Sequence, residues 1–298
     1  MYHRNYRNAS FVLLLTALTT TSLSAAEGLA DVGDRVRQYV PVKLTSDLTE
    51  LTKKQKEMLP LLIKAAEIME QCFWYESYGD PQSLFSELKD PNTRKLTRIN
   101  YGPWDRLDGN EPFVKGFPAK PLGANFYPQD MTREEFDGAD LPGKADLYTF
   151  LRRARDGRLK TIPYREAFND EMRDASALLN EAAALAEDPG FARYLRLRAD
   201  ALLTDDYQPS DLAWMDMKTN TLDVVIGPIE TYEDQLFGAK AAHEGFVLIK
   251  DQNWSAKLAK YASFLPELQR GIPVDDKYKQ ELQGFEIITK DSHGIFST

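Results

Sequence analysis

The residue types that hold metal ions in enzymes are scarce in this sequence. Its histidines are His3, His243 and His293. His243-Glu244 begins like a zinc-binding His-Glu-x-x-His helix, in which a second imidazole one turn later faces the same ion. Position 247 is a valine, so this match fails. The chain also has no nucleophile elbow, phosphate-binding loop, dinucleotide-binding loop, EF-hand loop or Cys-x-x-Cys pair. Local motifs alone therefore predict no enzyme.

Carboxylates are the abundant reactive groups, with 46 Asp and Glu against 37 Lys and Arg. Glu230 and Asp234 are close enough in sequence to share proton-donating and proton-accepting roles on one face. Spacing alone is weak evidence, because most acidic residues of a protein are solvated surface. The net charge of −9 argues against nucleic acid and anionic lipid as partners. Cations or neutral ligands are the partners that this balance favours.

The first 26 residues have the order of a secretory signal peptide. Arg4 and Arg7 precede an apolar run over residues 11–18, and a stretch of small residues ends at Ala26. We expect cleavage after Ala26 and export to the periplasm or beyond, with no membrane attachment afterwards. The alternative is an uncleaved anchor helix, which the polar residues 19–21 oppose.

Two regular elements frame a loop-rich segment in the first half of the chain. Thr52 and Gln55 have the spacing of a capping box, and apolar residues at helical intervals predict a helix over about 53–76. Cys72 lies at an apolar position of this helix and is expected in the core. Residues 79–130 are rich in Pro, Gly and aromatics, which predicts loops with short pieces of structure.

The second half is predicted to be helical and then to change to strands. From Thr132, a second capping position, we expect helices to about residue 204, including stretches at 147–157, 164–187 and 191–203. Apolar and β-branched runs predict strands within about 221–250, and a helix follows over 254–268. The fold class is α+β and rich in helix.

Two longer segments are more specific than these patterns: Asn100-Tyr-Gly-Pro-Trp-Asp-Arg-Leu-Asp108 and Ile226-Gly-Pro-Ile-Glu-Thr-Tyr-Glu-Asp234. Together with residues 123–128, 216–220 and 246–250, they resemble the bacterial branch of the dipeptidyl peptidase III family of zinc metallopeptidases. The resemblance covers most of the chain after residue 26. It implies two lobes beside a wide cleft, the lower built around a β-barrel and the upper mainly helical and carrying zinc.

The chain resembles the lower lobe of that family. The resemblance implies a lower lobe over residues 27–270 with a partial β-barrel or antiparallel sheet, and no zinc-binding upper lobe. Residues 271–298 would be the start of the upper lobe or an aberrant tail, so we expect a truncated chain. His293, in this tail, is expected to be incidental.

The resemblance also assigns candidate site residues. Glu230 would bind the free α-ammonium of a short peptide, and Tyr232 would point its hydroxyl at the scissile carbonyl as a catalytic and substrate-binding group. Trp104 and Asp105 would line the cleft and contact the substrate. By residue type alone, Glu230 is instead a solvated acid and Tyr232 a packed aromatic.

The family's zinc motif, His-Glu-x-x-Gly-His with a later glutamate, is absent from these 298 residues. Zinc is therefore a cofactor of the full-length family and not of this chain, which we expect to be inactive as a peptidase by itself. A zinc-bearing lobe would be the missing partner. The alternative is a non-catalytic exported protein that binds short peptides. A third interpretation is an unstable half of a peptidase without function.

Overall fold

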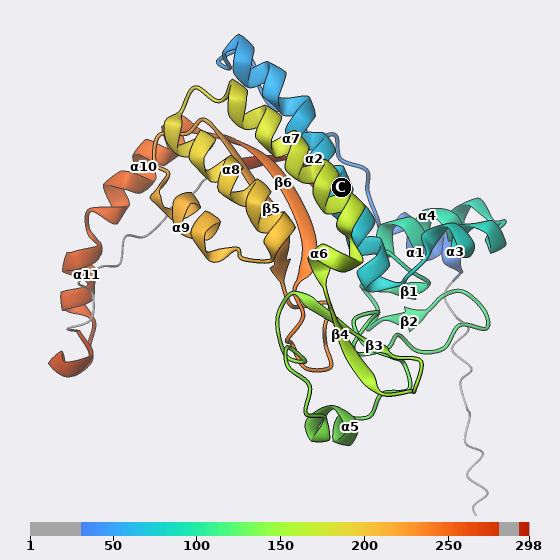
Figure 1. The fold of residues 1–298 in the computed structure, drawn as a ribbon. Helices are drawn as coiled ribbons and strands as arrows, with labels where there is room; N and C mark the ends of the chain where they lie inside the picture. Colours follow the sequence, from blue (N-terminus) through green and yellow to red (C-terminus); the bar gives the residue numbers. More distant parts are fainter. Residues whose placement is uncertain (1–30, 280–291, 298) are drawn as a thin grey trace, which may run out of the picture.

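The computed structural model describes residues 31–279 and 292–297. Its elements are arranged around one long helix, α2, which packs against α7 and against β6 of a three-stranded sheet (Figure 1). The helices are α1 (Val32–Arg37), α2 (Lys53–Ser77), α3 (Pro81–Glu87), α4 (Pro91–Asn100), α5 (Arg133–Gly138), α6 (Tyr164–Ala167), α7 (Asn169–Leu185), α8 (Pro189–Thr204), α9 (Gln208–Asp216), α10 (Gln252–Ala262) and α11 (Leu265–Gly271), with a short 3-10 turn at Asp276–Tyr278. The strands are β1 (Trp104–Asp105), β2 (Glu111–Pro112), β3 (Thr149–Arg153), β4 (Leu159–Pro163), β5 (Leu222–Glu230), β6 (Ala242–Lys250) and β7 (Ser292–Ser297).

The predicted helix at 53–76 is confirmed as α2. Thr52 accepts a hydrogen bond from the Gln55 backbone N–H, and the Gln55 side chain accepts one from the Thr52 N–H, so the capping box is complete. Cys72 is buried as predicted, at 1% exposure. The buried face of α2 packs on β6, and α7 lies alongside α2. The position of the sheet is therefore set by its packing against α2.

The helix predicted at 164–187 is divided at Phe168 into α6 and α7, and the helix predicted at 191–203 is present as α8 with slightly different ends. Asp188 caps α8 by accepting a hydrogen bond from the Phe191 N–H, and Pro189 occupies the first helical turn, where its missing N–H costs nothing. Pro189 therefore starts α8. The helix predicted at 254–268 is divided into α10 and α11, neither of which has a buried residue; Figure 1 draws both running away from the sheet.

The predicted strands near 221–250 are confirmed as the antiparallel pair β5 and β6, with β7 antiparallel on the far side of β6. The sheet comes very close to α2 at Gly245. A Cβ atom at this position would lie 2.7 Å from both the Cα and the Cβ of Ala66. Only glycine lets the strand and the helix backbone approach this closely.

Replacing Gly245 with alanine should therefore destabilise the protein by about 1–3 kcal/mol, because the new methyl group overpacks the contact with Ala66. The free energy of unfolding in urea measures this. Gly138→Ala is the matched control, because nothing lies within 4 Å of a Cβ there. Equal, small effects of the two substitutions would contradict the close approach.

The prediction of a helix over 147–157 is wrong, so residues 132–204 are not helical throughout. Residues 149–163 form the antiparallel hairpin β3–β4. Leu147, Phe150, Leu151 and Ala154 have helical spacing, but Phe150 and Leu151 are consecutive buried residues of a strand, and Gly157 turns the chain with a φ of +82°. The four apolar positions fit the helical period, but a short strand that is buried on both faces also has consecutive apolar residues, so the spacing could not distinguish the two.

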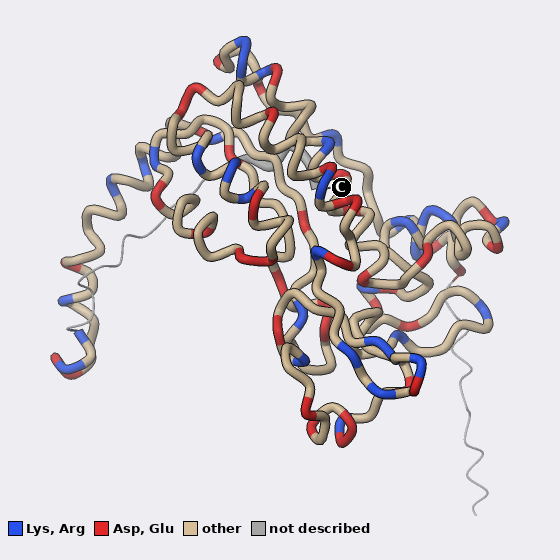
Figure 2. The backbone as a smooth tube through the Cα atoms, in the orientation of Figure 1, with Lys and Arg blue, Asp and Glu red and all other residues tan. Residues whose placement is uncertain are grey.

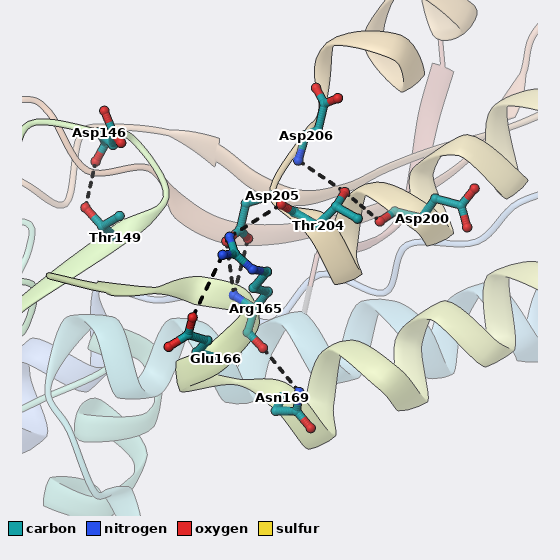
Figure 3. A network of polar contacts seen from close by, with 9 residues as sticks. All are labelled: Asp146, Thr149, Arg165, Glu166, Asn169, Asp200, Thr204, Asp205 and Asp206. Atoms are coloured by element: carbon teal, nitrogen blue, oxygen red, sulfur yellow. Dashed lines mark hydrogen bonds and ion pairs between the residues drawn. The ribbon is translucent and has the colours of Figure 1, made fainter. Parts of the chain in front are cut away.

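An ion pair fixes the hairpin to the helical layer. Arg165, directly after β4 in α6, donates to the Asp205 carboxylate from its backbone nitrogen (3.2 Å) and its guanidinium (2.9 Å) (Figure 3). Asp205 ends α8 in the left-handed conformation, with a φ of +61°. This pair joins the start of α6 to the end of α8, so the hairpin and helices hold one position relative to each other.

The helix-rich α+β class is confirmed, with small antiparallel sheets. Of the predicted partial β-barrel or antiparallel sheet, the antiparallel sheets are present: the strands of residues 31–279 and 292–297 form two two-stranded sheets and one three-stranded sheet, and none closes into a barrel. No helix within these ranges is long and apolar enough to cross a membrane. The predicted signal peptide lies outside the described residues. Lys and Arg are interspersed with Asp and Glu along the chain (Figure 2).

Candidate functional site

The candidate residue Glu230 lies where the ladder between β5 and β6 becomes irregular. Pro228 pairs with His243 and Glu230 with Ala242, so the register shifts between Pro228 and Glu230. A bulge of this kind bends the strand and redirects the side chain that follows. Glu230 is half-buried as a result, and the chain then enters the loop 231–241 with Tyr232 exposed.

Glu230 lines a hollow of about 300 Å³ between α2, the end of α4 and the two strands. Carboxylates from three elements line it: Glu70 from α2, Glu230 from β5 and Glu244 from β6. The remaining lining residues are Phe73, Tyr101, His243, Gly245 and Phe246. The hollow therefore combines an acidic wall with aromatic surface.

The acidic wall has an electrostatic consequence at Glu244. Burial, followed by repulsion from Glu230 and from Glu76 behind it, raises the pKa of Glu244 to about 7. Like charges held close together in a partly dry site favour protonation of one of them. A cation in the hollow would relieve that repulsion.

Replacing Glu244 with glutamine should raise the free energy of unfolding at pH 8 by about 1 kcal/mol, after discounting for solvent screening. The folded-state pKa is raised, so the stability that Glu244 contributes is present below about pH 4.5 and is lost as the pH rises through about 7. Urea unfolding at both pH values measures this. The difference between variant and parent should vanish near pH 4.5; a constant difference across the range would contradict it.

A buried acid and histidine pair supports the floor of the hollow. Glu76 accepts a hydrogen bond from the His243 backbone N–H (2.7 Å), and its other oxygen lies 2.6 Å from His243 Nδ1. Burial raises the pKa of Glu76, although His243 partly opposes that shift. The rings of Tyr164 and Phe168 pack against the imidazole. This pair fixes β6, and with it Glu244, against α2.

Tyr101 contributes a hydroxyl to the same hollow. It ends α4 in the left-handed conformation, with a φ of +53°, and its hydroxyl lies 3.3 Å from Glu70 Oε1. Burial, with the nearby Glu70 charge, raises the pKa of Tyr101. Tyr101 also packs edge-on against Phe73 at 4.8 Å between ring centroids. The predicted motif around residues 100–108 therefore contributes to the site through its first residues.

Trp104 and Asp105 are placed differently from Glu230 and Tyr232. The Trp104 indole donates to the Pro118 carbonyl (2.8 Å), and its ring lines a separate hollow of about 330 Å³ with Phe117. Asp105 is 2% exposed and paired with Arg35 at 2.6 Å. The structure thus does not bring these two residues to the hollow of Glu230, and their contact with substrate stays a prediction.

Three contributors to the site were missed by sequence reasoning. Glu70, Glu76 and Glu244 were not singled out as site residues, although Glu244 was considered as part of a zinc motif. The hairpin provides a signal for Glu244: β5 and β6 pair antiparallel, so residues shortly before Glu230 lie opposite residues shortly after Ala242. Glu70 and Glu76 carry no comparable signal, because many helices present acids.

The donor set does not fit a zinc ion. No group of three His, Cys, Asp or Glu that could hold a metal ion occurs in the part of the chain that the structure describes. His243, which lines the hollow, uses Nδ1 for Glu76. His293 lies in β7, where its backbone pairs with Ile249 of β6.

Comparisons with known proteins identify relatives of this arrangement. Residues 160–286 match the model of peptidase family M49. Dipeptidyl peptidase III from Caldithrix abyssi has 37% identity and a TM-score of 0.82, over 89% of this chain and 52% of that one. Dipeptidyl-peptidase III from Corallococcus sp. strain EGB has 33% identity and a TM-score of 0.76, over 84% and 49%.

A curated plant protein is also similar. Nudix hydrolase 3 of Arabidopsis thaliana is 32% identical over 307 residues, which is 82% of this chain and 40% of that protein. The chain thus spans about half the length of the solved structures and 40% of the plant relative that it matches.

Proposed function

The chain resembles the dipeptidyl peptidase III (M49) family of metallopeptidases, and from this premise we propose that its acidic hollow binds the free amino end of short peptides. The observation that carries the proposal is the meeting of Glu70, Glu230 and Glu244 around one hollow. An α-ammonium group is the cation that a peptide offers, and charge-assisted hydrogen bonds to carboxylates are strong.

Tyr232 is proposed to contact the first peptide bonds beyond the amine. It follows Glu230 by two residues and is 76% exposed, so its hydroxyl is available to a ligand that extends out of the hollow. A phenol can donate a hydrogen bond to a carbonyl and stabilise charge on its oxygen. Trp104 and Asp105 remain proposed contacts of a longer peptide.

We propose that these 298 residues supply the peptide-binding part of a DPP III-like peptidase and that hydrolysis needs zinc ligands from outside them. The support is the sequence itself, which holds no His-Glu-x-x-Gly-His element. No catalytic step is assigned to the residues present. Binding without turnover by a stand-alone exported peptide-binding protein is the alternative function, and a test for zinc-dependent cleavage after addition of candidate partners separates the two.

Titration calorimetry with a tetrapeptide and its N-acetylated form tests the binding proposal. We expect the free-amine peptide to bind at least ~10-fold more tightly, because acetylation removes the charge that the carboxylates bind. Mass spectrometry of the peptide after the titration should find it intact. Equal affinities of the two forms would refute recognition of the amino end.

Export of the protein is a separate proposal. It rests on the order of residues 1–26: basic, apolar and then small side chains. The intact mass of the protein isolated from its host tests it. A mass that lacks residues 1–26 is expected, and a retained Met1 would contradict cleavage.

A further inference from the structure

The loop that carries Tyr232 is held by two consecutive buried carboxylates. Asp234 Oδ1 accepts the backbone N–H groups of Leu236 and Phe237 at 3.1 Å, and Oδ2 accepts those of Ala239 (2.9 Å) and Lys240 (3.1 Å). The Tyr127 hydroxyl donates to Oδ2 at 2.7 Å. Asp234 therefore organises the loop internally and joins it to the loop-rich segment.

Glu233 faces two cations from that same segment. Arg106 donates to its oxygens at 2.8 and 3.2 Å, and Lys120 donates at 2.5 Å. Glu233 is 6% exposed. Burial alone would raise the pKa of its carboxyl, but the charges of Lys120 and Arg106 outweigh burial and lower it, so Glu233 is ionised at neutral pH.

Arg106 connects this cluster to the hollow. Its Nε donates to the Asn100 carbonyl at 2.8 Å, and its guanidinium lies over the Phe73 ring at 5.6 Å from the centroid. Phe73 lines the hollow of Glu230. A continuous set of contacts thus runs from the wall of the hollow through Arg106 to Glu233, next to the exposed Tyr232.

An exposed side chain on a mobile loop loses both backbone and side-chain conformational entropy on binding, whereas one on a fixed loop loses only the side-chain part. Tyr232 lies between Glu230, at the end of β5, and Glu233, which is buried and paired with Arg106 and Lys120. The turn is closed by a hydrogen bond from the Asp234 N–H to the Thr231 carbonyl at 3.1 Å. The backbone on both sides of Tyr232 is therefore fixed.

We propose that Glu233 is a positioning residue: held by Arg106 and Lys120, it fixes the turn at 231–234 so that Tyr232 is preorganised to contact a peptide bound at Glu230. The inference rests on the proposed function for the ligand, but the ordering of the turn is a property of the free protein. The two can be tested separately.

The ordering is tested with a spin label at position 232. Cys72 is buried, so the cysteine introduced by Tyr232→Cys provides the accessible thiol to which the label is attached. Electron paramagnetic resonance should find a restricted label in this protein and roughly three-fold faster motion after adding Glu233→Gln. Asp205→Asn, which loses the ion pair with Arg165, is the matched control and should leave the label unchanged. Unchanged motion in the Glu233→Gln protein would overturn the proposal.

The coupling to ligand is tested with a double-mutant cycle of Glu233→Gln and Tyr232→Phe. Glu233→Gln should weaken binding of the free-amine tetrapeptide roughly 10-fold when Tyr232 is present and less than two-fold when it is phenylalanine. Additive effects would indicate a merely structural role and overturn the proposal.

If the Glu233→Gln protein folds poorly, a second variant tests the same proposal. Arg106→Gln removes one of the two cations that hold Glu233, and the Arg106 side chain is 33% exposed. We expect this variant to increase the label motion and to weaken peptide binding through Tyr232 as Glu233→Gln does, but by less. If the parent protein bound free and acetylated peptides equally, the proposed function would fail, while the label at position 232 would still decide the ordering by Glu233.

Discussion

Replacing Glu230 with glutamine should weaken the binding of free-amine peptides roughly 10- to 100-fold. A change of this size corresponds to the free energy of one charge-assisted hydrogen bond. The glutamine keeps the size of the side chain and removes its charge, so the bulge at the end of β5 should persist. Affinity for the N-acetylated peptide should stay almost unchanged. Titration calorimetry of both peptides measures the effect.

Glu134→Gln is the control for Glu230→Gln. Glu134 is exposed and lines a different hollow, next to α5, so this variant removes the same charge from the protein at another place. It should bind like the parent. A similar loss in both variants would mean that net charge, and not the hollow, attracts the peptide.

Replacing Glu76 with alanine should lower the free energy of unfolding by about 3–5 kcal/mol. The substitution removes the two Glu76 carboxylate oxygens, one of which accepts from the His243 backbone N–H while the other contacts Nδ1, and it leaves both His243 groups without a partner in a dry site between α2 and β6. Buried groups that lose their partner pay the full cost of desolvation. Urea unfolding followed by circular dichroism measures the change.

Glu57→Ala is the matched control for Glu76→Ala, because it makes the same substitution in the same helix. Glu57 forms a surface pair with Lys53 at 3.7 Å, and such pairs contribute little. Its effect on unfolding should be much smaller than that of Glu76→Ala. Near-equal effects would contradict a structural role for the pair of Glu76 and His243.

The regular elements could be predicted where one period was dominant. The helix at 53–76 has a capping box and a long apolar stripe, and the strands of 222–250 have β-branched runs, so both were predicted from local signals. The hairpin at 149–163 was not predicted, because Leu147, Phe150, Leu151 and Ala154 satisfy the helical period by chance. The partial barrel came from the resemblance and not from any pattern in the chain.

The sequence singled out Glu230 and Tyr232 because they stand in a distinctive segment; of the two, Glu230 lines the hollow, and the role of Tyr232 stays a prediction. The other carboxylates of the hollow come from α2 and β6, and the sequence does not say which helix faces the strand end. Gly245 decides this, because its missing side chain lets β6 touch Ala66. Tertiary packing therefore brings Glu70 and Glu76 to the site.

A crystal structure of the protein with the free-amine tetrapeptide tests the central claim most directly. The account predicts the peptide ammonium within about 3 Å of a Glu230 carboxylate oxygen, inside the hollow that Glu70 and Glu244 also line. The rest of the peptide should extend past Tyr232. A peptide bound with its amine in solvent, or in the hollow beside Trp104, would contradict the account.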